Sequence, residues 1–265
     1  MSTVAVIGCG PAGLFAAKAA QDLGHEVAIM SPKRESKFYG AQFLHRPIPG
    51  FCNPDADGYI RTIRVGSAAG YAQRVYGDAT RLTSWSRVPT EPQPAWNLRT
   101  AYEKAWKHFE QDIAHWTLDP DDLVDFEQRF DLVVVTAPKW KFCIKGHNFS
   151  STTIFVTRRL MTLGGEQNFI VYNGMATQAE NNWYRTSKIF GHTSTEFSAP
   201  LDRAQPDVEG IDDWEVGYKI VGTDCDCHPN VVFAGRMGLW VPGVLTHHAY
   251  ESVISACSER FPTTV

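Results

Sequence analysis

Four short apolar runs along the chain predict the strands of a buried parallel sheet. They span residues 4–7, 27–30, 132–135 and 231–234. Each run is continuously apolar, which is typical of strands that are covered on both faces. Between the first two runs, Pro11 suits the first turn of a helix and Gly24 suits the residue just beyond its end. Residues 3–31 therefore predict a strand–helix–strand unit with a right-handed crossover.

Further elements are predicted from capping and periodicity. Asn97 is placed to cap a helix whose apolar side chains recur on one face as far as Phe109. From residue 142 to about 197, polar and β-branched residues alternate, which predicts a half-buried antiparallel sheet. From Gly243 onward, apolar residues recur at a spacing of four and predict a closing helix. Residues 31–96 show no long period, so we expect loops and short strands that build over a ligand.

The turn after the first strand carries a dinucleotide-binding motif. Gly8, Gly10 and Gly13 form the pattern Gly-x-Gly-x-x-Gly between a buried strand and a helix. In that context Gly8 permits a tight turn, Gly10 lets backbone N–H groups reach a pyrophosphate, and Gly13 lets the helix pack closely. Pro11 and Ala12 open the helix, whose dipole favours the phosphates. The motif predicts a bound dinucleotide.

The end of the second strand leaves the identity of that dinucleotide open. Ser31 stands where an acidic residue usually accepts the adenosine ribose hydroxyls. A serine hydroxyl can still bond to the ribose, and the nearby Lys33 and Arg34 can meet a phosphate or lie over the adenine. Because a basic residue in this region also accommodates a 2′-phosphate, these residues allow NADP as well as FAD.

Two later segments resemble the glutathione-reductase-type flavoprotein superfamily, which includes amine oxidases and UDP-galactopyranose mutases. Residues 130–138, a strand that ends in small residues, look like its second landmark. Residues 230–236 look like its C-terminal flavin motif, with Arg in place of the commoner Asp, as in UDP-galactopyranose mutases. The resemblance implies FAD as the cofactor, with Gly235 and Arg236 at its pyrophosphate and ribityl region.

The closing helix offers this flavin a further contact. If the helix begins at Gly243, the N–H groups of Val244 and Leu245 face the pyrimidine edge, where the dipole favours the negative charge of reduced flavin. The alternative is that Val244 and Leu245 are simply the first core residues of that helix.

Together these features predict an α/β fold with two domains. One is a Rossmann-type FAD-binding domain built on a parallel sheet, and the other is a mainly antiparallel β substrate domain inserted into it. We expect residues 1–50, 97–140 and 220–265 to form the FAD-binding domain. We expect residues 51–96 and 141–219 to form the substrate or cap domain.

Two segments are candidates for the chemistry. Gln42, His45 and Arg46 share one loop, in the region that approaches the isoalloxazine in the superfamily that the chain resembles. His45 is the first candidate for a base or a substrate-orienting group, and the alternative is a surface histidine in a Pro-rich loop. Tyr184 and Arg185, in the expected substrate domain, can stack a planar ring and meet an anion. An exposed strand carrying Tyr and Arg is also common in any sheet.

Histidine and cysteine near the C-terminus add two weaker candidates. His247 and His248 lie in the first turn of the expected closing helix, where one of them can carry a proton. Cys225, Cys227 and His228 invite comparison with a zinc site, but no second pair with ligand spacing stands out. We therefore expect a surface turn there and no metal.

Composition and charge limit the class of protein. The chain has 265 residues, 43% of them hydrophobic, which suffices for a substantial core. A net charge of −4 and a pI near 6.1 argue against non-specific binding of polynucleotide phosphates. Six scattered cysteines and the lack of a signal-peptide pattern favour the cytoplasm. No run reaches the ~18 apolar residues of a membrane span, and no feature predicts an oligomeric state.

These observations lead to three hypotheses of function. The favoured one is an FAD-dependent oxidoreductase or lyase that oxidises the C–N bond of an amine or amino-acid-like substrate. Residues 40–50 and 183–187 resemble phage-encoded FAD-dependent enzymes that trim amino-acid-conjugated thymine in DNA, which implies a nucleotide-like substrate or a modified DNA base. The alternatives are a redox-neutral flavoenzyme resembling UDP-galactopyranose mutase, and a non-catalytic FAD-binding protein.

Overall fold

The computed structural model describes residues 1–32, 34, 38, 42–158, 168–175, 183–198 and 215–262. In the first half of the chain the elements are β1 (Thr3–Ile7), α1 (Pro11–Asp22), β2 (Glu26–Met30), β3 (Gly58–Gly66), α2 (Ala68–Tyr76), α3 (Ser84–Arg87), β4 (Gln93–Ala95), α4 (Leu98–Phe109), β5 (Ile113–Ala114) and α5 (Pro120–Arg129). In the second half they are β6 (Leu132–Val135), the 3-10 helix η1 (Lys139–Phe142), β7 (Phe149–Thr157), β8 (Phe169–Gly174), β9 (Trp183–Ile189), β10 (His192–Phe197), β11 (Glu215–Thr223), β12 (Val232–Phe233), α6 (Gly235–Leu239) and α7 (His248–Arg260).

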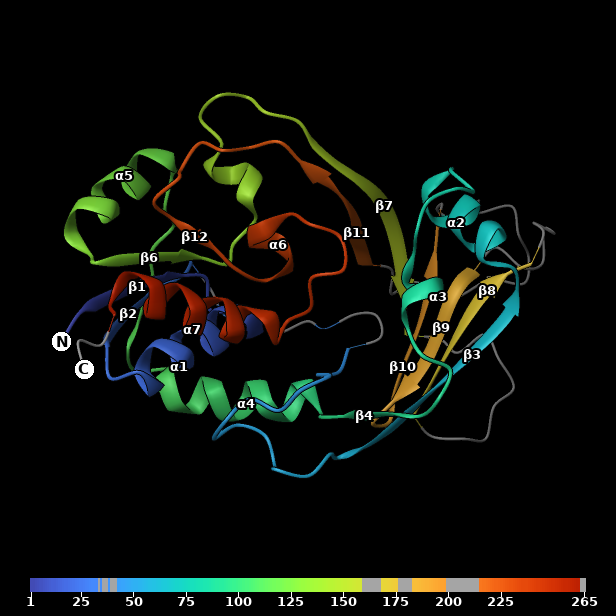
Figure 1. The fold of residues 1–265 in the computed structure, drawn as a ribbon. Helices are drawn as coiled ribbons and strands as arrows, with labels where there is room; N and C mark the ends of the chain where they lie inside the picture. The colour runs from blue at the N-terminus through green and yellow to red at the C-terminus, as the bar shows by residue number, and fades with distance from the viewer. Residues whose placement is uncertain are drawn as a thin grey trace.

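A parallel sheet with helices on both faces forms one half of the molecule (Figure 1). Its strand order is β12-β6-β1-β2-β5, and the four predicted apolar runs supply β1, β2, β6 and β12. Val4 and Val6 of β1 pack on the face covered by α1, α4 and α7. Ala5 and Ile7 point to the other face, where side chains of α5 and η1 cover them. Burial on both faces explains why these strands read as continuous apolar runs.

The strand–helix–strand unit predicted for residues 3–31 is confirmed. Pro11 occupies the first turn of α1, and Gly24 has φ of +81° just beyond the helix end, a conformation that suits glycine. Ala16 and Ala20 are fully buried, which lets α1 lie close to β1 and β2. β1 pairs in parallel with β2 on one side and with β6 on the other.

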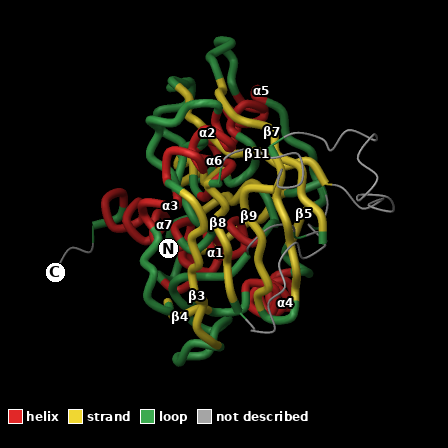
Figure 2. Tube along the Cα trace, turned by 90° about the vertical axis from the view of Figure 1, so that its right-hand side faces the viewer, coloured by secondary structure: helices red, strands yellow, loops and turns green. Residues whose placement is uncertain are grey.

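The second sheet is mainly antiparallel, as predicted. Its strand order among the described residues is β11-β7-β10-β9-β8-β3-β4, and only the β3–β8 pair is parallel. Figure 2 shows β3, β8 and β9 of this sheet side by side. β7 and β11 connect it with the parallel sheet, and β11 crosses the expected domain boundary between residues 219 and 220.

Residues 31–96 are more regular than the sequence analysis expected. They contain the nine-residue strand β3 and the nine-residue helix α2, which Ser67 caps by accepting a hydrogen bond from the N–H of Gly70. Gly77 ends α2 in the left-handed conformation, with φ of +69°. The short apolar face of α2, with Tyr71 and Val75, was hidden by the glycine and polar residues around it.

The closing helix was also predicted with the wrong start. α7 begins at His248 rather than at Gly243, and the residues between form turns. Leu245 is 36% exposed, so it does not continue the buried row of Ala249, Val253 and Cys257 despite its i−4 spacing. None of the described helices has the length and apolar composition needed to cross a membrane.

Candidate functional site

The glycine-rich turn leaves open space at the start of α1. Gly8 has φ of +113°, and a Cβ on Gly13 would lie 1.8 Å from the carbonyl oxygen of Gly8, so both positions require glycine for the turn itself. Gly10 differs, because its φ of −67° suits any residue and a Cβ built there meets nothing within 4 Å. The missing side chain at Gly10 thus keeps a space free rather than relieving strain.

This turn fits the pyrophosphate of a dinucleotide. No side chain caps the N-terminus of α1 at Gly10, and Pro11 has no N–H to satisfy there. The N–H groups at the start of α1 therefore face the space that Gly10 leaves open, at the positive end of a 12-residue helix. Residues Gly10, Pro11, Ala12 and Gly13 are the ones that would hold the phosphates.

The carboxyl ends of three parallel strands meet beside this turn. The N–H of Thr136, after β6, donates to the carbonyl of Ile7 at 2.9 Å, and the N–H of Ala234, after β12, donates to the carbonyl of Val135 at 2.9 Å. Gly235 follows with φ of +71°, and a Cβ there would lie only 2.7 Å from the Cβ of Ala12. The predicted C-terminal motif is therefore packed against the first turn of α1, at the edge where open α/β sheets bind ligands.

The ribose side of the turn is only partly described. Ser31 is buried, and its backbone is held by Ala114 and Trp116 at 3.0 and 3.2 Å. Lys33 lies outside the described residues. The guanidinium of Arg34 pairs with Glu103 at 2.6 Å and stacks 4.6 Å from the ring centre of Trp106. Arg34 is thus held against α4, beside Glu103 and the indole ring of Trp106.

A cavity of about 370 Å³ lies between the second sheet, α3 and the turns before α7. Four cationic side chains line it, namely Arg87, Arg185, Lys219 and Arg236. Among the described residues that line it, none is acidic. Its volume falls in the range of small-molecule sites, and its cationic wall favours an anion.

Arg185 and Lys219 share one buried carboxylate behind the cavity wall. Glu196 is 2% exposed and forms ion pairs with Arg185, its cross-strand neighbour, and with the Nζ of Lys219 at 2.9 Å. Burial alone would raise the pKa of Glu196, but the charges of Arg185 and Lys219 lower it to about 2. One carboxylate thus pairs with two of the four cations that line the cavity, and its single negative charge compensates only one of them.

Lys219 is the cation most sensitive to its surroundings. Burial lowers the pKa of Lys219 to about 7, with further lowering by the charges of Arg185 and Arg236, against the opposing effect of Glu196. Its ammonium lies 5.5 Å from the ring centre of Tyr184. Tyr184, predicted to stack on a ligand, is fully buried and does not line the cavity, so it supports Lys219 from behind.

Two neighbouring histidines, His45 and His247, lie at the cavity, and one of them belongs to its lining. His45 lines it, its ring 4.3 Å from Phe43 and 5.9 Å from His247. Burial, then the charge of His248, lowers the pKa of His45. Burial, with smaller effects from His248 and His45, lowers the pKa of His247 to about 3. Both rings are therefore uncharged at neutral pH, and His45 is the one that faces the cavity.

Other predicted residues of this region lie in different places. Arg46 is largely exposed and pairs with Glu251 of α7 at 2.9 Å, away from the cavity. Gln42 has a buried Oε1 to which no described residue donates a hydrogen bond. Val244 and Leu245 line the cavity but lie in the loop before α7, and the N–H of Leu245 donates to the Nδ1 of His248 at 3.1 Å. The helix-dipole role predicted for this pair therefore does not apply.

Sequence reasoning missed Lys219, Glu196 and Arg87. Glu196 lies opposite Arg185 only because β9 and β10 pair in this register, and Lys219 reaches the same carboxylate from β11. Arg87 lies in the short helix α3, inside the region that was expected to be loops. The pairing of strands is what brings these charges together, and no local pattern in the sequence signals it.

Solved structures share this arrangement at low sequence identity. A reduced UDP-galactopyranose mutase matches with a TM-score of 0.59 at 11% identity, over 100% of this chain and 97% of that chain. A variant of HpxO from Klebsiella pneumoniae, complexed with FAD, matches with a TM-score of 0.55 at 11% identity, over 99% and 82%. The p-nitrophenol 4-monooxygenase PnpA from Pseudomonas putida matches with a TM-score of 0.55 at 11% identity, over 98% and 79%.

The chain shares its fold with these enzymes, one of which is complexed with FAD. The likeness extends over both sheets, because each match covers nearly all of this chain. No protein-family model matches the sequence. No curated protein matches it either. The fold is therefore established by structure, and the chemistry has to be argued from the site.

Proposed function

We propose that this chain is an FAD-dependent oxidoreductase that binds a small anionic substrate in the cationic cavity. The observation that carries the proposal is the cavity wall, where the four cations Arg87, Arg185, Lys219 and Arg236 have no acidic lining residue in the described part of the chain and only one carboxylate, that of Glu196, behind them. A substrate carboxylate or phosphate would supply the missing charge.

The position of the cavity relative to the glycine turn supports FAD as the cofactor. Gly235 packs on Ala12 of the glycine-rich turn, and the next residue, Arg236, lines the cavity, so a cofactor with its pyrophosphate at Gly10–Gly13 would have the cavity close by. Bound FAD supplies a hydride acceptor that no amino-acid side chain provides. The HpxO structure described as complexed with FAD has the same fold, which supports this assignment.

The substrate we propose is an amine or amino-acid-like molecule, oxidised at its C–N bond. Arg185 and Lys219 would hold its carboxylate. His45, which lines the cavity and is uncharged at neutral pH, would take a proton from the substrate ammonium and leave the free amine, the form whose C–N bond a bound FAD could oxidise. Starting from its ammonium form, the substrate would lose one proton and one hydride, which is two electrons and two protons in total, and become a protonated imine that water hydrolyses. An amino-acid-conjugated base fits the same description.

The test is anaerobic mixing of the yellow holoprotein with matched pairs of substrates. Each pair consists of an amino acid and the amine that lacks its carboxylate, and a short oligonucleotide carrying amino-acid-conjugated thymine completes the panel. We expect the carboxylate-bearing member to bleach the flavin at lower concentration. If no member bleaches the flavin, or if the pairs behave alike, the proposal is wrong.

Lys219 gives this test a matched variant and a pH signature. Because the pKa of Lys219 is lowered to about 7, its charge is present below that pH and is lost as the pH rises. The KM for carboxylate substrates should therefore rise above pH 7 in the wild type, roughly tenfold for the loss of one charged hydrogen bond. Lys219→Met should have the high KM at every pH, and Arg46→Gln at the surface should behave as the wild type.

A redox-neutral reaction is the second candidate, and one observation favours it. The reduced UDP-galactopyranose mutase matches this chain over its whole length, and three arginines and a lysine also suit a substrate diphosphate. Under this alternative, adding substrate does not reduce the oxidised flavin. Turnover occurs only after the flavin has been reduced with dithionite. The same anaerobic mixing experiment, repeated with pre-reduced protein and nucleotide sugars, distinguishes the two.

A further inference from the structure

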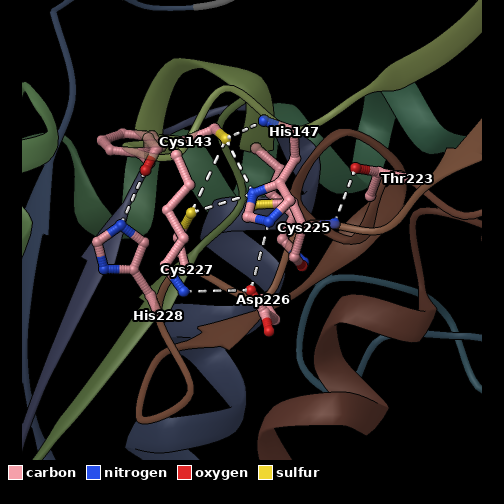
Figure 3. Close-up of polar contacts among 10 residues, drawn as sticks. Cys143, His147, Thr223, Cys225, Asp226, Cys227 and His228 are labelled. Atoms are coloured by element: carbon pink, nitrogen blue, oxygen red, sulfur yellow. Dashed lines mark hydrogen bonds and ion pairs between the residues drawn. The ribbon is translucent and has the colours of Figure 1, made fainter.

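Three cysteines and a histidine from two distant segments meet where the two sheets join (Figure 3). Cys143 follows η1 and His147 precedes β7, whereas Cys225 and Cys227 follow β11. Their four potential ligand atoms all lie within 4.8 Å of one another. Cys225 is buried and the other three are half-buried, so the cluster is largely shielded from water.

The distances among Cys143, His147 and Cys227 match those of a tetrahedral metal site, and Cys225 lies within 4.8 Å of all three. Zinc–sulfur bonds of about 2.3 Å and zinc–nitrogen bonds of about 2.0–2.1 Å place tetrahedral ligands about 3.8 Å apart for two sulfurs and about 3.5 Å apart for sulfur and nitrogen. The Sγ atoms of Cys143 and Cys227 are 3.8 Å apart. The Nδ1 of His147 lies 3.4 Å from each of these two sulfurs.

We propose that Cys143, His147, Cys225 and Cys227 bind one Zn²⁺ ion. Three thiolates and one imidazole form a soft donor set that selects zinc over magnesium or calcium. Four protein ligands leave no position open for water, which is typical of a structural site rather than a catalytic one. None of these four residues lines the substrate cavity or belongs to the glycine-rich turn. The proposed site takes the place of the surface turn without metal that the sequence predicted.

Groups around the cluster fix the ligands as they do in zinc proteins. The Nε2 of His147 lies 3.5 Å from the Oδ1 of Asp226, so a carboxylate orients the ring whose Nδ1 faces the sulfurs. The N–H of His147 donates to the Sγ of Cys143 at 3.2 Å. His228 is excluded as a ligand because its Nε2 contacts the carbonyl of Phe142 at 2.8 Å and its Nδ1 faces Glu127.

The location gives the ion a structural role. β7 leads from the parallel-sheet domain into the second sheet and β11 leads back, and they pair with Phe149 opposite Thr223. The cluster joins the chain just before β7 to the chain just after β11, so the ion would close the base of this pair. β11 also carries Lys219, and the ion therefore helps to hold one wall of the cavity in place.

A disulfide between Cys143 and Cys227 is the competing explanation for this proximity. It would remove two thiols and two hydrogens and leave His147 and Cys225 without a role in the cluster. Zinc binding instead displaces thiol protons and keeps all three sulfurs reduced. Intact mass under denaturing, non-reducing conditions therefore separates the two.

The decisive measurement is the metal content of the full-length protein purified without chelators or metal-affinity resin. We expect about one zinc per chain by elemental mass spectrometry, with six alkylatable thiols after denaturation in a chelator. Cys143→Ser should lose the zinc, whereas Cys52→Ser, a half-buried cysteine outside the cluster, should retain it. A wild-type protein that contains no zinc and does not take up added Zn²⁺, or whose mass shows a disulfide, overturns the proposal.

Two further measurements do not depend on whether Cys143→Ser folds. Replacing zinc with Co²⁺ in the wild type should give the intense d–d absorption of tetrahedral cobalt thiolate, at wavelengths longer than flavin absorbs, and a weak octahedral spectrum would contradict the site. Asp226→Asn keeps all four ligands but removes the carboxylate beside His147. It should weaken zinc affinity roughly tenfold or more in competition with a chelating dye, and an unchanged affinity would refute the orienting role of Asp226.

Discussion

Gly10→Ala separates cofactor binding from folding at the glycine-rich turn. The backbone at Gly10, with φ of −67° and ψ of 176°, is accessible to alanine, and the added Cβ meets no atom within 4 Å. The apoprotein should therefore be as stable as the wild type, or more stable by about 0.4–1 kcal/mol, since alanine restricts the unfolded chain. The same methyl group would occupy the space that the pyrophosphate needs.

The expected loss of affinity follows from the contacts at that space. Displacing a phosphate from one backbone N–H removes a hydrogen bond to a charged group, worth about 1.5–3 kcal/mol. This corresponds to roughly a 10- to 150-fold increase in the Kd for FAD. At an FAD concentration 100 times the wild-type Kd, the ligand stabilises the wild type by about 2.7 kcal/mol. A variant with 100-fold weaker binding would gain only about 0.4 kcal/mol.

Thermal unfolding with and without added FAD measures both quantities in one experiment. Gly13→Ala is the control for structure, because its Cβ would lie 1.8 Å from the backbone oxygen of Gly8 and should destabilise even the apoprotein. If Gly10→Ala keeps the wild-type apoprotein stability and also the full FAD-induced rise in Tm, then the open space at Gly10 is not the pyrophosphate site.

Three further predictions concern the helix cap, the buried charges and the cavity loop. Asn97→Ala removes a side chain that accepts hydrogen bonds from two N–H groups of α4, and urea unfolding should show a loss of about 1 kcal/mol. Glu196→Gln leaves Arg185 buried beside a neutral partner and should cost roughly 3–5 kcal/mol at neutral pH. Folding lowers the pKa of Glu196 from 4.5 to about 2, so the stabilisation by its charge is present above pH 4.5 and disappears as the pH falls toward 2. The stability of the variant should therefore approach that of the wild type in acid. His45→Gln should slow flavin reduction by substrate, roughly 100-fold if His45 is the base, while Arg46→Gln leaves it unchanged; equal rates for the two variants would contradict the assignment.

Local sequence signals predicted β1, α1, β2, α4, β6 and β12 in the parallel-sheet half of the molecule. There, β1, α1 and β2 follow one another along the chain, and the glycines of the turn between β1 and α1 are required by the local backbone, which the sequence pattern indicates. α5 shows that such signals can be overlooked. Asp119 caps it in a reciprocal capping box with Asp122, a pattern visible in the sequence, and Leu123 and Phe126 mark its buried face. The sequence analysis assigned no helix there.

The cavity could not be predicted in the same way, because its parts come from separate strands. Arg185 was chosen as an anion ligand from its neighbours in the sequence, and it does line the cavity. Its partner Glu196 and the neighbouring cation Lys219 depend on the register of β10 and β11, and a shift of one residue would turn either side chain to the opposite face. Charges that compensate each other across strands leave no local pattern.

The cysteine cluster follows the same rule, because spacing along the sequence does not show that its four residues lie together. Zinc motifs are recognised by two short ligand pairs, and the chain has both, a Cys-x-x-x-His at Cys143 and His147 and a Cys-x-Cys at Cys225 and Cys227. Separated by a whole inserted sheet, the pairs look unrelated along the sequence. The antiparallel pairing of β7 with β11 joins them, because the start of one strand must lie beside the end of the other. The chain leaves the parallel-sheet domain on β7 and returns on β11. Because these two strands pair, residues just before β7 and just after β11 lie together although they are far apart in the sequence.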